Sequence, residues 1–341
     1  MRPVIAVIDS GIDDAYFRGH SGMFTGSFSC ISEQEDKEFV SDQFPQDENG
    51  HGTMVVDLIH VLNPQCRFLV VKILNADCLA TTGSLAEALR FLCTQQVDII
   101  HMSISVTQED DQAPEITRLC TELRQQGKVI VCSVENRKKE SFPAYLPSVL
   151  GVAGGVFRNS GDYNFEPRRN IQFVCDATPT LVSGFKSRPS LFSGNSKAAC
   201  VATSVIARII QETNSNRNYH IESRLPLLNA TTPFLEITGG EMPCIQSNRE
   251  IDFAGYEWNA AGVFGDVCDI FGCDKTEVLS ERMIYSCEDF SGERFKFLFD
   301  RISERLGMEF YPNGLQYVSI EWLWCLFEYI DQVYKQEGNK R

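Results

Sequence analysis

The sequence predicts an α/β fold with a mostly parallel sheet, followed by a small all-α domain, and three observations support this. Through the first two thirds of the 341 residues, short continuous apolar runs alternate with stretches of helical periodicity. Because the runs lack polar alternation, helices should cover both faces of the sheet. From about residue 255 the strand-like runs stop, and segments rich in Phe and Trp with helical spacing replace them.

The elements of the first part follow from these patterns. Continuous apolar runs predict buried strands at 3–8, 68–74, 97–104, 128–134 and 148–153. Apolar residues at helical spacing predict helices at 52–62, 84–95 and 112–126. Ser84 follows a glycine at the start of the second helix, so we expect it to be the N-cap.

The later part of the chain has a different character. Residues 214–254 are rich in polar side chains, Gly and Pro, and we interpret them as a connector. Further helices are expected at 261–272, 293–306 and 320–334. The chain is therefore expected to consist of a first domain, residues 1–213, then this connector, and then a helical domain, residues 255–341.

The composition excludes several classes of protein. Its hydrophobic share of 43% and charged share of 23% are ordinary for a globular chain. A net charge of −15 argues against binding to nucleic acid, and no apolar run reaches the roughly 20 residues that span a bilayer. The 13 cysteines have no metal-binding spacing and follow no secretion signal, so we expect free thiols in the cytoplasm and no bound metal.

Three short motifs contain the parts of an acyl-transfer site. The apolar run of VIAVIDSGID ends in Asp9, NGHGT places His51 between two glycines, and Ser196 opens the small-residue helix of SGNSKAAC. A serine hydroxyl is a weak nucleophile until a histidine takes its proton, and a carboxylate must orient that histidine. Each residue alone would be interpreted as a turn, loop or cap residue. The order Asp, His, Ser is one of three known solutions to this geometry.

With these motifs, residues 1–213 resemble subtilisin-like serine proteases, the subtilases. VKILNADCLATTGSLAEALRFL, IIHMSIS and GKVIVCSVENRKKESFPAYLPSVLGVAG resemble segments that this family places between its histidine and its serine. The resemblance implies a subtilisin-like three-layer fold with Asp9, His51 and Ser196 as the catalytic triad. It also implies Asn136 as the side chain of the oxyanion hole, together with the backbone N–H of Ser196.

The sequence departs from the family at several places. Met54 replaces the usual second histidine, and the glycine-rich calcium loop is missing from 52–64, so we expect no calcium there. Asn195, Lys197 and Cys200 replace the Thr, Met and Pro of the usual nucleophile motif. No propeptide-like segment precedes the first strand. We therefore expect a cytoplasmic member of the family that lacks some of its usual segments and folds without a propeptide.

The resemblance also implies where a substrate binds. A peptide should bind as an extended strand between two backbone edges of the protein. These edges comprise Cys78, Leu79, Ala80, Ser103, Ile104 and Ser105. Ser105 and Glu135 stand where the family usually has glycine, so the primary specificity pocket should be narrow. Glu135 either attracts a basic side chain or pairs with Arg137 at the rim.

The tail resembles acyl-carrier-like (peptidyl-carrier) domains. VFGDVCDIFGCDKTEVL, FKFLFDRISERLGMEF and SIEWLWCLFEYI resemble three helices of that family. The Asp-Ser-Leu attachment site is not preserved, and Ser291 lies at or one place from the required position. We therefore expect a degenerate carrier fold that serves as a docking module without phosphopantetheine.

Together these observations predict a cytoplasmic serine endopeptidase that performs specific, limited proteolysis. Peptide-maturation systems for ribosomally made natural products contain both subtilases and carrier-related proteins. We therefore expect the enzyme to remove a leader peptide from a precursor, with the tail recruiting other peptide-maturation enzymes. Two alternatives stay open: a macrocyclase in which an amine resolves the same acyl-enzyme, and a non-catalytic peptide-binding scaffold.

Overall fold

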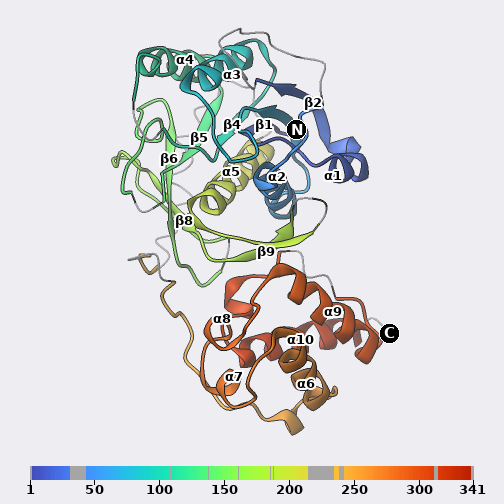
Figure 1. The fold of residues 1–341 in the computed structure, drawn as a ribbon. Helices are drawn as coiled ribbons and strands as arrows, with labels where there is room; N and C mark the ends of the chain where they lie inside the picture. The colour runs from blue at the N-terminus through green and yellow to red at the C-terminus, as the bar shows by residue number, and fades with distance from the viewer. Residues whose placement is uncertain are drawn as a thin grey trace. The chain divides into compact units, whose positions relative to one another are not determined.

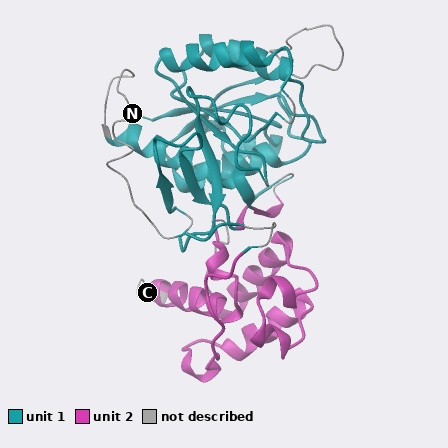
Figure 2. Ribbon diagram, turned by 90° about the vertical axis from the view of Figure 1, so that its left-hand side faces the viewer, with its two compact units in different colours: residues 1–178, 183–187, 193–242 teal, residues 179–182, 188–192, 243–341 magenta. Residues whose placement is uncertain are grey.

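The fold is known from a computed structural model with two compact units, shown in Figure 2. The first unit comprises residues 1–178, 183–187 and 193–242, and the second comprises 179–182, 188–192 and 243–341. The second unit thus includes two short stretches from the middle of the chain. The described residues are 2–30, 44–106, 109–136, 138–159, 161–184, 186, 188–213, 234–237, 242–310 and 314–338.

The first unit is built on a sheet whose eight described strands have the order β2-β3-β1-β4-β5-β6-β8-β7. β1 (Val4–Asp9) pairs in parallel with both β3 (Arg67–Lys72) and β4 (Ile99–Met102). The strand order therefore reverses at β1, and α/β sheets place their sites outside the carboxyl ends of strands at such a point. The remaining strands are β2 (Phe24–Ser29), β5 (Val129–Ser133), β6 (Leu150–Gly155), β7 (Tyr163–Phe165) and β8 (Phe173–Asp176).

Helices cover both faces of this sheet (Figure 1). On one face, α3 (Thr82–Thr94) and α4 (Ala113–Gln125) contribute their leucines to a core that also holds Ala6 and Ile8 of β1. Because side chains alternate along a strand, Asp9 at the end of β1 points to the opposite face.

The opposite face is covered by α2 (His51–Leu62) and α5 (Gly194–Thr213), which pack against each other. α5 also packs on β4, β5, β6 and β8. A buried hydrogen bond of 2.8 Å between His101 Nδ1 on β4 and Thr203 Oγ1 joins the sheet to this helix. The predicted three-layer α/β arrangement with a mostly parallel sheet is confirmed.

The ends of the predicted elements agree with the structure to within two residues, except for the last helix, which was predicted at 320–334 and spans Leu323–Gly338. The predicted N-cap of α3 was wrong. Thr81 is the N-cap, and its Oγ1 accepts a hydrogen bond of 3.0 Å from the Ser84 N–H, because the helix begins two residues before the predicted start. Several short elements were not predicted, since they lack a long apolar pattern: β2, β7, β8 and α1 (Asp14–Gly19), which Asp13 caps.

The second unit is mainly helical. Its helices are α6 (Ala260–Phe271), α7 (Glu277–Ser280), α8 (Met283–Ser286), α9 (Gly292–Leu306) and α10 (Leu323–Gly338). The core is aromatic, with Phe271, Phe295, Phe299 and Phe327 almost fully buried. No helix in the described ranges is long and apolar enough to cross a membrane.

A short hairpin belongs largely to this second unit. It consists of β9 (Thr180–Ser183) and β10 (Pro189–Phe192). The hairpin is tied to the tail sequence by hydrogen bonds from Leu181 N–H to the Leu315 carbonyl at 3.1 Å and from Gly314 N–H to the Leu181 carbonyl at 2.7 Å. A Cβ on Gly292 would lie 2.4 Å from the Pro189 carbonyl oxygen, so only glycine lets α9 approach β10 this closely.

Candidate active site

Asp9 and His51 form a hydrogen-bonded pair at the carboxyl end of β1. The distance between Asp9 Oδ1 and His51 Nδ1 is 2.7 Å, and Asp9 is fully buried. The same carboxylate oxygen accepts a second hydrogen bond of 2.8 Å from the N–H of Ser10. Because an ionised carboxylate can only accept, the shared proton lies on His51 Nδ1, and Nε2 is the basic nitrogen of the neutral ring.

The surroundings of His51 raise its pKa. Burial alone would lower the pKa of the imidazole, but the charge of Asp9, its hydrogen bond, and the more distant charge of Asp47 outweigh that effect. The resulting pKa lies above the ordinary histidine value. An imidazole in this setting is suited to accept a proton near neutral pH.

Asp47 is a buried carboxylate that links the residue after Asp9 to the helix that His51 begins. Its Oδ1 accepts a hydrogen bond of 2.9 Å from the hydroxyl of Ser10, the neighbour of Asp9. Its Oδ2 accepts from the N–H of Thr53 at 2.9 Å and from the hydroxyl of Thr53 at 2.6 Å, in the first turn of the helix that His51 begins. The motif pattern did not single out this residue. The one available signal was an acidic residue four places before His51.

The glycines around His51 allow the turn after β1 to approach α2. A Cβ on Gly52 would lie 2.3 Å from the carbonyl oxygen of Gly11. Gly11 itself has a φ of 110°, in the region that favours glycine. The absence of a side chain at Gly52 therefore lets the start of α2 lie against the turn that follows Asp9.

Ser196 lies in the first turn of α5, which runs parallel to α2. One turn into each helix, the Sγ of Cys200 lies 3.9 Å from the carbonyl oxygen of Val55. Near the far ends of both helices, Gln211 Nε2 donates a hydrogen bond of 2.9 Å to Asn63 Oδ1. Because the two helices lie side by side in the same direction, their first turns, which carry the predicted base and nucleophile, lie at the same end.

Asn136, the predicted side chain of the oxyanion hole, lies beside the start of α5. Its Oδ1 accepts a hydrogen bond of 3.3 Å from the Asn195 N–H. Gly194 has a φ of 80°, and a Cβ there would lie 3.3 Å from the same oxygen. Asn136 is an exposed residue, and Asn195, which it contacts, directly precedes Ser196.

The predicted substrate edge Ser103–Ser105 follows β4 at the same end of the sheet. The Ser103 hydroxyl lies 2.8 Å from Nε2 of His101, whose other ring nitrogen contacts α5. Burial lowers the pKa of His101 to about 4, so this ring is neutral. His101 thus joins the predicted substrate edge to the helix that carries Ser196. Ile104 and Ser105 lie outside the named strands.

The second predicted edge, Cys78–Ala80, begins in a tight turn. Cys78 has a φ of 58°, in the left-handed region, so its backbone is not extended. The N–H of Leu79 donates to Asn75 Oδ1 at 3.0 Å, and its carbonyl accepts from the Asn75 N–H at 3.0 Å. The Leu79 side chain is 66% exposed. A peptide strand at this edge would therefore pair from Ala80 onward.

Glu135 pairs with a lysine rather than standing alone. Its Oε2 lies 2.5 Å from Lys138 Nζ, and its backbone N–H donates to the Ser141 hydroxyl at 2.9 Å. The alternative partner, Arg137, lies outside the described residues. Because Lys138 neutralises the carboxylate, Glu135 does not present an unpaired charge at this place.

Ser291, the predicted carrier position, lies in the second unit as the N-cap of α9. It lines a pocket of about 390 Å³ together with residues of β10, including Pro189 and Leu191. Arg188 and Glu293 pair at this pocket at 3.6 Å. Ser291 is therefore not part of the site around Asp9 and His51.

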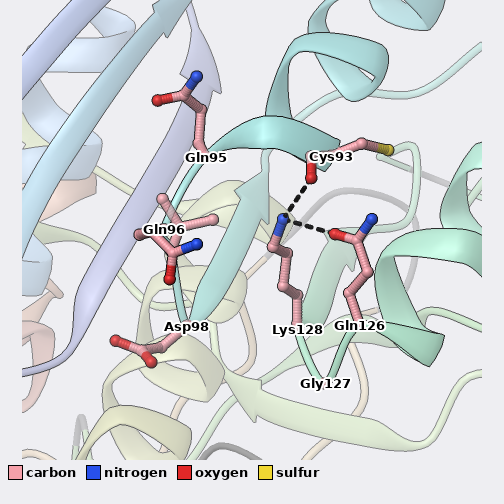
Figure 3. A pocket seen from close by; sticks show the side chains of 8 residues that line it. Cys93, Gln95, Gln96, Asp98, Gln126, Gly127 and Lys128 are labelled. Atoms are coloured by element: carbon pink, nitrogen blue, oxygen red, sulfur yellow. Dashed lines mark hydrogen bonds between the residues drawn. The ribbon is translucent and has the colours of Figure 1, made fainter.

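A second pocket, of about 330 Å³, lies in the first unit near Lys128 (Figure 3). Lys128 Nζ donates to the carbonyl oxygen of Leu92 at 2.5 Å and to Gln126 Oε1 at 2.8 Å, and so closes the end of α3. The pocket includes Asp98 and Lys128, which precede β4 and β5. It thus lies at the amino ends of these strands, away from the candidate site. Within the described ranges, no cluster of His, Cys, Asp or Glu is arranged to hold a metal ion.

Comparison with known proteins agrees with this fold. The solved structure of Sphericase superimposes with a TM-score of 0.55 and 15% identity, over 72% of this chain and 94% of Sphericase. Minor extracellular protease Epr of Bacillus subtilis (strain 168) is 23% identical over 234 residues, which cover 65% of this chain. This chain spans only 34% of the length of that relative. A sequence model described as the Subtilase family matches residues 2–232, well over half of the chain, and the chain therefore belongs to the subtilase family.

Proposed function

We propose that this protein is a serine endopeptidase that cuts a peptide or small protein precursor at specific sites. The observation that carries the proposal is the buried Asp9–His51 pair, with Oδ1 and Nδ1 2.7 Å apart. Ser196 lies in the first turn of the parallel helix at the same end, and Asn136 contacts the residue before it. In this proposal Ser196 is the nucleophile, His51 the general base, Asp9 its orienting carboxylate and Asn136 a donor to the oxyanion.

The mechanism follows from these roles. Ser196 Oγ attacks the scissile carbonyl carbon while His51 Nε2 takes its proton, and Asp9 stabilises the resulting imidazolium. The carbonyl π electrons move onto oxygen, where the Asn136 side-chain amide and the Ser196 N–H donate hydrogen bonds. Each such donor contributes about 3 kcal/mol to lowering the barrier. His51 then gives its proton to the leaving amine as the C–N bond breaks, and water resolves the acyl-enzyme by the same steps.

The substrate in this proposal is a ribosomally made precursor peptide from which the enzyme removes a leader in the cytoplasm. The peptide adds as a strand to Ser103–Ser105 on one side and to the edge from Ala80 on the other. A paired Glu135 and a serine at position 105 favour restricted cleavage over general digestion. The tail acts as a docking module for other maturation enzymes and carries no phosphopantetheine on Ser291.

The test is cleavage of candidate precursor peptides by the full chain and by Ser196→Ala, with products read by mass spectrometry. A fluorophosphonate should label Ser196 in the folded protein and leave Ser196→Ala unlabelled. Fragments that have gained one water indicate hydrolysis, as proposed. A core peptide that gains no water would identify a macrocyclase instead.

Two controls make the result decisive. Ser193→Ala removes an exposed hydroxyl three residues before Ser196 and should leave cleavage and labelling unchanged. If folded wild type binds precursor peptide but is neither labelled nor able to cut any peptide, the protein is a binding scaffold and the protease proposal is wrong.

A further inference from the structure

Asn195, the residue before the proposed nucleophile, makes an unusual set of hydrogen bonds. Its Nδ2 donates to two carbonyl oxygens, that of Val134 at 3.1 Å and that of Glu135 at 3.3 Å. Its Oδ1 accepts from the N–H of Gly154 at 2.8 Å. Its backbone N–H donates to Oδ1 of Asn136. One residue thus connects the start of α5 to the segment after β5 and to β6.

The packing around Asn195 leaves it little freedom. A Cβ on Gly154 would lie 2.8 Å from Asn195 Oδ1 and 2.5 Å from the Cβ of Ala177, so glycine is required where the amide meets β6. The neighbouring Gly194 N–H donates to the Ala177 carbonyl at 2.8 Å. The Asn195 side chain is therefore held in one position between the carboxyl ends of β5 and β6.

The position of Asn195 affects the proposed oxyanion hole because the two proposed donors come from different elements. Asn136 follows β5, whereas the N–H of Ser196 belongs to α5. Donors that act on a developing charge are effective only when their separation is fixed before the reaction. Asn195 bonds the backbone on the amino side of Asn136 through its side chain and bonds Asn136 itself through its own N–H.

We propose that Asn195 is a positioning residue that sets the distance between the two halves of the oxyanion hole. This inference rests on the proposed protease function. It predicts that loss of the Asn195 side-chain donors weakens stabilisation of the transition state while substrate binding in the ground state stays the same. A residue with a merely structural role would instead lower the fraction of folded protein and leave turnover per active site unchanged.

The sharpest variant is Asn195→Asp, which has nearly the same shape. It keeps the acceptor for the Gly154 N–H but loses both donors, and it places a carboxylate oxygen against the carbonyls of Val134 and Glu135. We expect kcat per titrated active site to fall roughly 10- to 100-fold, less than for loss of an oxyanion donor itself, with KM changed less than about twofold. Active sites are counted with a fluorophosphonate, so unfolded protein does not enter the rate.

A second readout follows the oxyanion itself. A peptide aldehyde forms a hemiacetal with Ser196, whose oxygen occupies the hole. Its inhibition constant should rise by about the same factor as kcat falls, whereas binding of the cleaved peptide product should not change. If the aldehyde binds Asn195→Asp as tightly as wild type, the inference is wrong.

Two further variants complete the series. Asn195→Thr has a single hydroxyl donor, so its kcat should lie between those of wild type and Asn195→Asp. If Asn195→Asp does not fold, the ratio of kcat in wild type to kcat in Asn195→Thr tests the inference in its place. Asn259→Asp makes the same chemical change at the N-cap of α6, where a carboxylate is equally suitable, and should match wild type. Equal kcat across all variants would overturn the inference. Inactive, unlabelled wild type would instead refute the proposed function.

Discussion

Lys197 and Asp176 form a fully buried ion pair directly beside the proposed nucleophile. Lys197 Nζ donates to Asp176 Oδ2, and both side chains are at most 1% exposed. Asp176 also accepts hydrogen bonds from the Thr178 hydroxyl at 2.8 Å and from the Phe157 N–H at 3.2 Å. Burial lowers the pKa of Lys197, while the charge of Asp176 opposes that shift. The charged lysine is therefore tolerated in the core only with its partner.

This pair predicts a characteristic pattern of stabilities. Lys197→Met leaves Asp176 buried without its cation and should lower the free energy of unfolding by about 3–5 kcal/mol. The double variant Lys197→Met, Asp176→Asn removes both charges, keeps an acceptor oxygen for the Phe157 N–H, and offers an amide N–H that the Thr178 hydroxyl can accept. It should be more stable than Lys197→Met alone. Denaturant unfolding of wild type, both single variants and the double variant measures the coupling, and strictly additive losses would contradict the buried pair.

The raised pKa of His51 predicts the acid limb of the pH–rate profile. The base must be neutral to accept a proton, so kcat/KM should rise with pH, with a midpoint above about 6.5. Asp9→Asn removes the charge that raises the pKa while burial still lowers it, so the midpoint should move down. It should also lower kcat by roughly 10⁴-fold, as in another protease with such a triad.

The matched control for that experiment is Asp14→Asn. Asp14 is the partly exposed partner of Arg18 on α1, and the same change there should leave the midpoint in place. An acid limb that does not move in Asp9→Asn would show that some other group controls the rate.

The Glu135–Lys138 pair predicts how specificity responds to charge. Lys138→Gln removes the cation beside Glu135 and leaves a carboxylate at the predicted rim of the pocket. In this variant, the ratio of kcat/KM for a substrate with Lys or Arg before the cleaved bond to kcat/KM for one with Leu should be roughly 2- to 5-fold higher than in wild type. An effect of this size is expected from the free energy of a partly exposed ion pair. Lys139→Gln removes a neighbouring exposed lysine and serves as control. Equal effects of both changes would mean that Glu135 does not face the substrate.

Two cysteines of the second unit predict a response to oxidation. Cys273 Sγ and Cys287 Sγ lie 2.9 Å apart, and the N–H of Glu288 donates to the Phe271 carbonyl at 3.1 Å beside them. Glutathione disulfide should convert the two thiols to a disulfide and release two glutathione thiols. The loop so closed should stabilise the fold by about 3 kcal/mol.

Intact mass spectrometry measures this oxidation as a loss of two hydrogen atoms. Cys268→Ser, which leaves the pair intact, should retain that loss, whereas Cys273→Ser should abolish it. In protein taken from cells with its thiols blocked, both cysteines should be reduced if the protein works in the cytoplasm, as proposed.

Local sequence was sufficient to predict the elements that carry the candidate site. Asp9 ends an apolar run and His51 and Ser196 open helical patterns, so each lies where an element begins or ends. The partners that hold them were not predictable in this way. Asn195 forms hydrogen bonds with Val134 and Gly154, and Lys197 forms an ion pair with Asp176. These partners lie far apart in the sequence, and hydrophobic periodicity predicts only local structure. Asp47 was missed because an acidic residue in a polar loop has no local sign of burial.

The hairpin β9–β10 determines how the chain can be divided. The second unit takes 179–182 and 188–192 from the interior of the chain, and β10 ends only four residues before Ser196. Its apolar residues Leu181, Val182 and Phe192 are at most 4% exposed. A fragment cut after residue 213 would retain these side chains and lose the tail segment at Leu315, whose carbonyl accepts a hydrogen bond from Leu181. No single cut in the chain can therefore separate the first unit from the second without dividing the hairpin from the segment that it pairs with.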